Sequence, residues 1–482
     1  MRRLGGHHFF RFIGEVLLGT SKRGRNHARA RRAGAATLAA LVFVSNGAFA
    51  QELKPHRFTL SECLALADQN APQLAAMRAQ LDMVHSQLEE ARWAPYFNWT
   101  LQVGGGVLPP ITGTPFYTSS TASALSTQVN GGIQPFLRVD LNGNIPIYTF
   151  GKIEGTLDAA KAQVRVKEWD VERIRLDLRR DVRRAYYGLM FARDAAYLAE
   201  DVRKKLEAAT GKMKEKLDRG DKSIDEVDKM RLDFSSDALA ARTGDIGKGE
   251  KFALAALRFL TGVQSRFDIV DEPLTRIDKP VGHIVRYLTA ARLYRPDVNM
   301  ARAGINGRRA LLHVARARML PDIGLALFGG YGLAPSAVQQ DNPWIADNFN
   351  RFGAGFAFGL RWSLDILPAA ARAHAAESAL DEVRAQERAA LGWSAVEVEN
   401  AHATALEAQN REEVWGRAEK RAKEWIATVE NAIDLGTKDE RHLLEPLQRY
   451  VDARFNHMQA LMDLNVAAAE LGRATGFDEG VP

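Results

Sequence analysis

One stretch of the sequence, from Leu137 to Gly220, constrains the fold more than any other. It opens with apolar residues that alternate with Arg138, Asp140, Asn142 and Asn144; the apolar set is Leu137, Val139, Leu141, Ile145 and Ile147. A period of two residues predicts a β-strand with one apolar face and one polar face. After Pro146 there is no proline until Pro273, and apolar residues recur at spacings of three and four: Leu178, Val182, Ala185, Leu189, Ala192, Ala196, Ala199, Val202, Leu206, Ala209 and Met213. Such a seam predicts a very long helix with coiled-coil-like packing.

The first 50 residues have the pattern of a secretory signal peptide. Nine basic residues and one acidic residue precede Gln51, an apolar run covers 33–44, and Ala48-Phe49-Ala50 gives a small-x-small cleavage pattern. The alternative is a membrane anchor, but the apolar run has only about 12 residues and a spanning helix needs about 20. We therefore predict a signal peptide at 1–50 and an exported mature chain.

The formal charge of +6 belongs to this N-terminal segment. Without it the chain has 56 basic and 58 acidic side chains, so nucleic-acid binding has no support from composition. No later apolar run is long enough for a transmembrane helix, so any return to a membrane must use β-structure. The only cysteine, Cys63, is expected to be a small buried side chain.

The first half of the mature chain has a simple order of predicted elements. Two short helical segments end at Pro95, and alternation then predicts a strand over 97–103. A loop rich in Gly, Pro, Ser and Thr leads to the strand and long helix described above. The helix turns at Gly220, a residue suited to a left-handed helix cap, and a second helix returns over 224–260.

The second half repeats this order. Pro296 and Pro321 correspond to Pro72 and Pro95, and Pro368 opens the second long helix. At an offset of 216 residues, Gly436 corresponds to Gly220 and the helical seam maps, broken only by Glu412, onto Val398, Ala401, Ala405, Ala408, Glu412, Trp415, Ala418, Ala422, Trp425 and Val429. A tandem duplication follows. The predicted boundaries are a first repeat at 51–262, a linker at 263–282, a second repeat at 283–476 and a tail at 477–482.

The strands and helices make different demands on their surroundings. Each half offers two strands of about ten residues or more, the length of a tilted membrane strand. Four strands cannot close a transmembrane barrel, whose minimum is about eight, and open edges are not tolerated in lipid. A barrel shared among copies of the chain is therefore expected, and with it a homo-oligomer.

The alternative is a soluble sandwich, which leaves nothing to cover the apolar face. The long helices, of about 70 residues and ~100 Å each, must stand outside the membrane.

The alternation also predicts which strand residues face the interior of such a barrel. An arginine facing lipid near the midplane costs about 2–4 kcal/mol, so the polar set should face the lumen. That set is Asn98, Thr100, Gln102, Arg138, Asp140, Asn142, Arg361 and Asp365. The passages between strands and helices are predicted at Pro95, Pro146, Pro321 and Pro368.

This chain resembles the TolC-type outer-membrane efflux proteins over nearly all of its mature length. The resemblance is carried by the duplicated element order and by Pro72 and Pro296 in the short helices. It is also carried by three local sequences, which are Ile145-Pro146-Ile147-Tyr148-Thr149-Phe150-Gly151, Ala185-Tyr186-Tyr187 and Leu435-Gly436-Thr437-Lys438.

The resemblance implies a mainly α-helical fold with membrane β-structure. Three copies would give twelve strands, four from each chain, in one outer-membrane β-barrel continuous with a long periplasmic α-helical barrel. The implied function is a passive exit duct of a tripartite efflux pump or a type I secretion system in a Gram-negative bacterium. The implied partners are a periplasmic adaptor, an inner-membrane transporter and outer-membrane lipid.

The resemblance also implies a gate near the periplasmic turns. Family members often have acids six and nine residues after the turn glycine of the second repeat, and here these positions hold His442 and Glu445. Glu226 fits the acid of the first repeat, and Lys438 stands where the family often has a basic residue. His442 departs from the pattern, and three such side chains near an axis would add a charge change between about pH 5 and 8. The alternative for His442, Glu445 and Glu226 is an ordinary solvated helix position.

The turn glycines are expected to receive the adaptor. Gly220 and Gly436 would let another backbone approach closely, a role compatible with simple turn capping.

The sequence contains no pattern of catalytic chemistry. No histidine pair at i, i+4 on a helix, no Cys–His cluster and no phosphate-binding glycine loop is present, so an enzyme, a cofactor and a metal site are not expected. The alternative function is a periplasmic coiled-coil adaptor or scaffold. Within the family, the cargo stays open among drugs, metal ions and a secreted protein, because an exit duct carries what its transporter delivers.

Overall fold

The computed structural model describes residues 56–112, 126–127, 132–218, 226–263, 267–277, 280–337, 347, 349–438 and 440–477. Contacts divide the chain into Met1–Pro55 and His56–Pro482, and the description concerns the second unit. The predicted signal peptide lies outside the described residues. Of the helices in these ranges, none combines the length and the apolar character that crossing a membrane requires.

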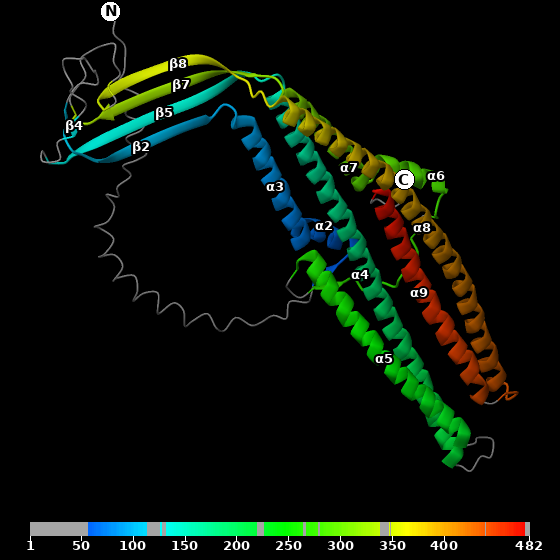
Figure 1. Cartoon of the computed structure of the whole chain (residues 1–482). Helices are drawn as coiled ribbons and strands as arrows, with labels where there is room; N and C mark the ends of the chain where they lie inside the picture. Colours follow the sequence, from blue (N-terminus) through cyan, green and yellow to red (C-terminus); the bar gives the residue numbers. More distant parts are fainter. Residues whose placement is uncertain are drawn as a thin grey trace, which may run out of the picture. The chain divides into compact units, whose positions relative to one another are not determined.

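A four-stranded antiparallel sheet combines strands from both halves of the chain (Figure 1). Its members, in spatial order, are β2 (Asn98–Leu108), β5 (Gln134–Tyr148), β7 (Asp322–Leu333) and β8 (Arg351–Arg361). The central strands β5 and β7 pair on both sides, whereas β2 and β8 each keep one edge unpaired among the described residues. Two further strands, β3 (Ile111–Thr112) and β4 (Ser126–Thr127), form a short antiparallel pair between β2 and β5. The four long strands predicted from the alternation are all present.

The helices occur in the same order in each half of the chain. An 11-residue helix and a 22-residue helix precede the strands, as α2 (Leu60–Asn70) with α3 (Pro72–Trp93) and as α6 (Ile284–Tyr294) with α7 (Pro296–Ala317). After the strands come the long helices α4 (Lys152–Asp218) and α8 (Ile366–Asp434), of 67 and 69 residues. The returning helices are α5 (Glu226–Thr261) and α9 (Leu444–Thr475), the latter preceded by the 3-10 helix η2 (Glu440–Leu443). At 1.5 Å per residue each long helix measures ~100 Å.

Equivalent glycines tie the returning helices to the short ones. Gly262 and Gly476 have φ of 67° and 75°, the left-handed conformation that ends a helix without strain only at glycine. A Cβ on Gly262 would lie 2.6 Å from the carbonyl oxygen of Asn70, and one on Gly476 would lie 2.7 Å from backbone atoms of Tyr294 and Arg295. Both glycines therefore allow the same close packing, just before the helix-opening prolines of α3 and α7.

Most residues of the two predicted helical seams are buried, and one buried position in α8 is shifted by one residue. In α4 the seam residues that are less than a tenth exposed are Leu178, Val182, Leu189, Ala192, Ala199, Val202 and Leu206, and in α8 they are Val398, Ala401, Ala405, Ala408, Ala422 and Val429. Trp425 was a predicted member, but it is 42% exposed and Ile426 is buried in its place. The observed seam runs from Ala422 to Ile426 to Val429, with spacings of four and then three residues. The predicted seam through Trp425 has spacings of three and then four, and both patterns fit one helix face.

The stretch predicted as a linker, 263–282, also takes part in the core. Its strand β6 (Phe267–Ile269) pairs in parallel with β1 (His56–Phe58). Phe267 and Ile269 are 2% and 0% exposed, in the cluster that also holds Cys63. Three residues are too few for alternation to predict a strand from sequence. As expected, Cys63 is fully buried.

Candidate functional site: the two faces of the sheet and the helix ends

The register of the sheet brings the predicted lumen residues onto one face. Across β2 and β5, Asn98 lies opposite Asn144, Thr100 opposite Asn142 and Gln102 opposite Asp140. Because side chains alternate between faces, these share a face with Arg138, Arg351 and Arg361. On β7 and β8 this polar face contains one large side chain, Phe328. Its other uncharged residues are small: Gly324, Ala326, Gly330, Gly332, Gly353, Gly355, Ala357 and Gly359. Seven of the eight predicted lumen residues lie on it; Asp365 does not.

Three charged side chains form a cluster toward the loop end of the polar face. The Nε of Arg138 donates to Asp140 Oδ2 at 2.6 Å, and Arg351 Nη2 donates to Asp140 Oδ1 at 3.2 Å. A Cβ on Gly330 would lie 3.1 Å from Asp140 Oδ1, so the absence of a side chain there lets the cluster lie across β7. The carboxylate is 16% exposed, whereas Arg138 and Arg351 are 56% and 41% exposed. Two exposed guanidinium groups thus surround one covered carboxylate.

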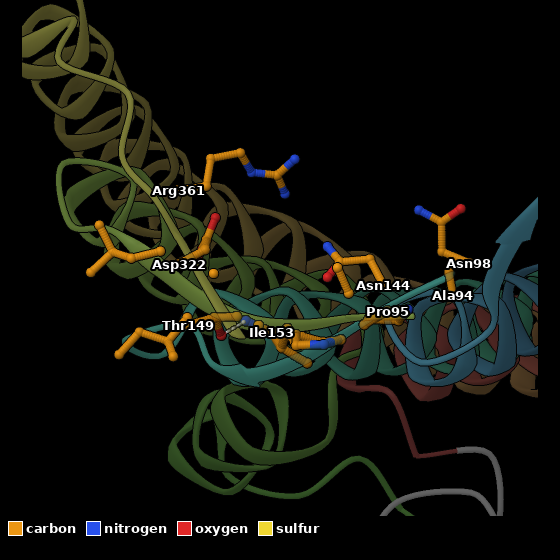
Figure 2. A pocket seen from close by; sticks show the side chains of 14 residues that line it. Ala94, Pro95, Asn98, Asn144, Thr149, Ile153, Asp322 and Arg361 are labelled. Carbon is orange, nitrogen blue, oxygen red and sulfur yellow. Dashed lines mark hydrogen bonds between the residues drawn. The ribbon is translucent and has the colours of Figure 1, made fainter. Parts of the chain in front are cut away.

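A hollow of about 410 Å³ lies where the sheet meets the helices, lined in part by Asn98, Asn144 and Arg361 (Figure 2). At its edge Lys152 Nζ donates to Asp322 Oδ1 at 2.8 Å, which neutralises both charges. Arg361 lies opposite Asp322 in the register, yet it has no hydrogen-bond or ion-pair partner among the described residues. The hollow therefore carries one uncompensated positive charge and two side-chain amides.

The opposite face of the sheet is apolar and exposed. On β2, Leu101 and Val103 are 63% and 64% exposed, and on β8, Phe352 is 84% exposed. The same face carries other large, exposed apolar side chains: Trp99, Val107, Leu137, Leu141, Tyr331, Leu333, Phe356, Phe358 and Leu360. No described element covers them. A continuous apolar face of this extent marks a surface that contacts lipid or another protein.

The predicted passage at Pro146 needs correction. Pro146 lies inside β5, and the pairing of β5 with β7 is irregular between Pro146 and Tyr148. Proline cannot donate to the strand ladder, and an irregularity accommodates it. The chain turns toward α4 only after the strand ends, where Phe150 and Gly151 both have left-handed φ of 53° and 85°.

The other three prolines lie closer to the passages predicted for them. Pro95 falls between the end of α3 and the start of β2, and Pro321 directly precedes β7. Pro368 lies in the first turn of α8, which begins at Ile366. Proline is tolerated there because its missing N–H would have no partner within the helix.

Asp365 is the predicted lumen residue that lies outside the strands. β8 ends at Arg361, and Asp365 directly precedes α8, where its carboxylate pairs with Arg372 at 2.8 Å. Trp362 and Leu364 continue the alternation beyond the strand, which explains the error. An acidic residue at a helix N-terminus is favoured by the helix dipole.

The end of the hairpin formed by α8 and α9 has a defined turn. Gly436 has φ of 71°, its N–H donates to the carbonyl of Ile433 at 2.8 Å, and the N–H of Thr437 donates to that of Ala432 at 2.9 Å. This pair of bonds is the Schellman motif, in which glycine ends a helix in the left-handed conformation. A Cβ on Gly436 would meet no atom within 4 Å, so the glycine is required here by its backbone conformation.

Three predicted gate residues near this turn have exposed side chains: Lys438, His442 and Glu445. The fourth, Glu226, is the first residue of α5, and its side chain lies outside the described structure, as does all of Gly220. The structure therefore brings three of the predicted gate residues to one hairpin end.

Sequence patterns missed two polar clusters that are partly buried between helices. In the first, the carboxylate of Glu397 on α8 accepts from both Arg295 and Arg473. Burial alone would raise the pKa of Glu397, but the hydrogen bonds from the two guanidinium groups lower it below its usual range. Arg295 is 8% exposed and also donates to the carbonyl of Ala474 at 3.2 Å. The cluster locks α7, α8 and α9 together at one level.

The second cluster contains Glu412, the residue that interrupts the predicted seam. His457 on α9 lies between two acids of α8, with Nδ1 2.5 Å from Glu419 Oε2 and Nε2 3.5 Å from Glu412 Oε1. The hydrogen bond with Glu419 raises the pKa of His457 above its ordinary value. A polar interruption in an apolar seam is the one sequence signal that could have located this cluster.

The described residues contain no group of three or more His, Cys, Asp or Glu side chains placed to hold a metal ion.

The comparison with protein families identifies one family. The sequence model of the outer membrane efflux protein family matches residues 63–242 and 288–477. No curated protein sequence matches the chain significantly.

Several solved structures share the fold at low sequence identity. The MtrE outer membrane channel of Neisseria gonorrhoeae is 17% identical, with a TM-score of 0.69 over 87% of this chain and 89% of that one. The CmeC outer membrane channel of Campylobacter jejuni is 17% identical, with a TM-score of 0.65 over 87% and 86%. The outer membrane protein VceC of Vibrio cholerae is 16% identical, with a TM-score of 0.66 over 87% and 96%. Since the family match covers most of the chain, with one segment in each half, this chain belongs to the outer membrane efflux protein family.

Proposed function

We propose that the chain is the outer-membrane exit duct of an efflux system, a channel that conducts cargo passively from the periplasm to the exterior. The observation that carries the proposal is the four-stranded sheet, with one face apolar and exposed and the other polar. A strand in a membrane barrel has this alternation, apolar toward lipid and polar toward the lumen. Membership of the outer membrane efflux protein family supports the same function.

The barrel is proposed to be shared by three copies of the chain. The sheet has two unpaired edges, on β2 and β8, and both strands have 11 residues. Four strands are too few to close a membrane barrel, and lipid does not tolerate an unpaired edge. Pairing β8 of one copy with β2 of the next in a homotrimer would give twelve strands and leave no edge.

The long helices are proposed to form the periplasmic part of the conduit. α4 and α8 are charged along their length and measure ~100 Å, so they would continue the barrel as a helical tube. A tandem duplication with repeats at 51–262 and 283–476 accounts for the repeated element order and for the equivalent packing of Gly262 and Gly476. A cleaved signal peptide at 1–50 and export through the inner membrane complete this proposal.

The hairpin ends are proposed as the gate and the adaptor site. Lys438, His442, Glu445 and Glu226 would close the tube by polar links, and Gly220 and Gly436 would receive a periplasmic adaptor that bridges to an inner-membrane transporter. Such a system is a tripartite pump or a type I secretion system, and the duct itself performs no catalysis. The Schellman turn at Gly436 supports the proposal because it presents Lys438 at the hairpin end.

Removing a polar link is expected to open the gate. Lys438→Ala or Glu226→Ala should raise single-channel conductance in planar bilayers, since each substitution deletes a charged side chain at the narrow end. Unchanged conductance in both variants would contradict the gate assignment but not the channel.

Adjacent residues on opposite faces of β2 test the orientation of the sheet. Leu101→Arg would place a charge on the lipid side, at a cost of about 2–4 kcal/mol in each copy. Thr100→Arg places the same side chain on the polar face and serves as the matched control. We expect Leu101→Arg to abolish heat-modifiable trimers in outer-membrane fractions and Thr100→Arg to preserve them. Equal effects of the two substitutions would contradict the membrane orientation.

A periplasmic coiled-coil adaptor or scaffold is the alternative, because its hairpin helices would look similar. It predicts a protein that stays soluble after cell lysis without detergent, and the exposed apolar face of the sheet argues against it.

A further inference from the structure

We propose, given the channel function above, that the polar face of the sheet makes the conduit selective for anions. The four long strands contain five charged residues: Arg138, Asp140, Asp322, Arg351 and Arg361. All five lie on the polar face by register. With Lys152, which pairs with Asp322, the sheet surface carries a net charge of +2 per chain, or +6 in a trimer.

The outer part of this charge comes from the cluster of Arg138, Asp140 and Arg351. A guanidinium group has five N–H donors, and the structure uses only Nε of Arg138 and Nη2 of Arg351 to hold the carboxylate. Asp140 is 16% exposed, so a passing ion meets the guanidinium groups, at 56% and 41% exposure, rather than the carboxylate. Their free donors suit carboxylate, phosphate and sulfonate groups, which arginine binds through paired hydrogen bonds.

The inner part of the positive charge comes from Arg361, which lines the hollow where the strands meet the helices. Its guanidinium has no partner among the described residues, and the acid opposite it, Asp322, is already bound to Lys152 at 2.8 Å. Asn98 and Asn144 line the same hollow and add amide donors. An anion reaching this level would meet one free cation and several neutral donors, with no free carboxylate among the residues that line the hollow.

The outer cluster and the inner Arg361 form two separate levels of positive charge along the strands. Arg351 and Arg361 are ten residues apart on β8, which is ~33 Å at the rise of a β-strand. That separation is several times the Debye length of about 8 Å at physiological ionic strength, so each level should influence passing ions on its own. Between them the β7 and β8 part of the face consists of glycine, alanine and Phe328, without an acidic residue that would favour cations.

The connecting loops add two negative charges per chain, both in the loop that joins β7 to β8, so the excess of positive charge is confined to the strand region. The loop between β2 and β5 contains no charged residue, and that between β7 and β8 contains Asp341 and Asp347. Asp347 accepts hydrogen bonds from the N–H groups of Phe349 and Asn350, at 2.8 and 2.9 Å, as part of a turn.

Reversal potentials across a potassium chloride gradient test the proposal with the full-length processed protein in planar bilayers. The wild-type channel is expected to pass chloride in preference to potassium. Arg351→Gln and Arg361→Gln should each lower the chloride-to-potassium permeability ratio by about 4- to 16-fold, because one positive charge ~5 Å from a hydrated ion enriches chloride about 2- to 4-fold and depletes potassium by the same factor. Asp140→Asn should raise the ratio, because it removes the one acid of the outer cluster.

Arg203→Gln is the matched control, since it removes one positive charge from an exposed ion-pair site of α4 far along the helix from the sheet. We expect it to leave the ratio unchanged. A cation-preferring wild-type channel, shifts of the same sign for Arg351→Gln and Asp140→Asn, or an equal shift for Arg203→Gln would overturn the anion proposal while leaving the channel function intact. Absence of any channel would instead contradict the proposed function.

Discussion

Replacing His457 by glutamine is expected to loosen the contact between α8 and α9 in a pH-dependent way. His457 Nδ1 lies 2.5 Å from Glu419 Oε2, and Arg454 Nη1 also donates to Glu419, at 2.9 Å. Glu412, on the other side of the ring, is bound by Arg276 at 3.0 Å, and Glu413 faces the same arginine at 3.6 Å. From α4, Asp194 lies close enough to Arg454 for an electrostatic interaction between the two side chains. Gly416 leaves room for the ring, since a Cβ there would lie 3.2 Å from His457 Nε2.

The sign of the pH dependence follows from two pKa shifts. The hydrogen bond with Glu419 raises the pKa of His457 above 6.5, so its stabilisation is complete below pH 6.5 and is lost as the pH rises through the raised value. Burial alone would raise the pKa of Glu419, but the hydrogen bond from His457 and the charge of Arg454 lower it below 4.5. Its stabilisation is present above pH 4.5 and is lost as the pH falls through the lowered value. The pair therefore contributes most between these two ordinary values.

The magnitude comes from the loss of the positive charge at residue 457. His457 and Glu419 are 17% and 16% exposed, so solvent screens them little. Glutamine can still donate to the ionised carboxylate but lacks the positive charge of the protonated ring. Two opposite charges about 4 Å apart attract by about 4 kcal/mol at an effective dielectric constant of about 20, and desolvation offsets part of this attraction, so glutamine should cost about 1–2 kcal/mol near pH 6. Amide hydrogen exchange of peptides around Glu419 and His457 should then be about 5- to 30-fold faster than in the wild type at that pH. Near pH 9 the ratio should approach 1.

An exposed histidine provides the control. His85→Gln on α3 should leave the exchange of the same peptides unchanged at both pH values. Equal acceleration by His457→Gln near pH 6 and near pH 9 would refute the reasoning, because it would mean that packing, and not charge, holds the contact.

Two further predictions concern local structure. Gly476→Ala should lower the unfolding temperature more than Gly436→Ala: both glycines are left-handed, at an alanine cost of about 1–2 kcal/mol, but only at Gly476 would the new Cβ lie 2.7 Å from backbone atoms of Tyr294. Equal shifts in thermal scans would contradict the packing at Gly476. Burial raises the pKa of Cys63 to about 12, so maleimide should label the native protein at least about 100-fold more slowly than the unfolded chain. Labelling of the native protein at the unfolded rate would contradict the buried position of this thiol.

Periodic features of the fold could be predicted from the sequence because periodicity reports burial directly. The alternation around Leu141 predicted β5, and the seam from Leu178 predicted the buried face of α4. Local exceptions could not be predicted in the same way. The alternation continues through Trp362, past the end of β8 at Arg361. In α8, helical periodicity allows either Trp425 or Ile426 to be the buried residue, and the structure buries Ile426.

The candidate site was predictable in part for the same reason. Face assignments such as Asn98 opposite Asn144 follow from the period of two, once the strands are paired. The ion pairs could not be predicted, because they depend on residues far apart in sequence: Arg351 reaches Asp140, and Lys152 reaches Asp322. Glu412 was visible only as an interruption of a seam.

The conductance of the purified full-length processed protein in a planar lipid bilayer tests the central proposal most directly. A conduit whose wall is shared by three copies should insert in discrete steps of uniform size, and only from the fraction that runs as a heat-modifiable trimer. Protein that remains soluble without detergent and produces no steps would contradict the proposal that the exposed apolar face of the sheet meets lipid.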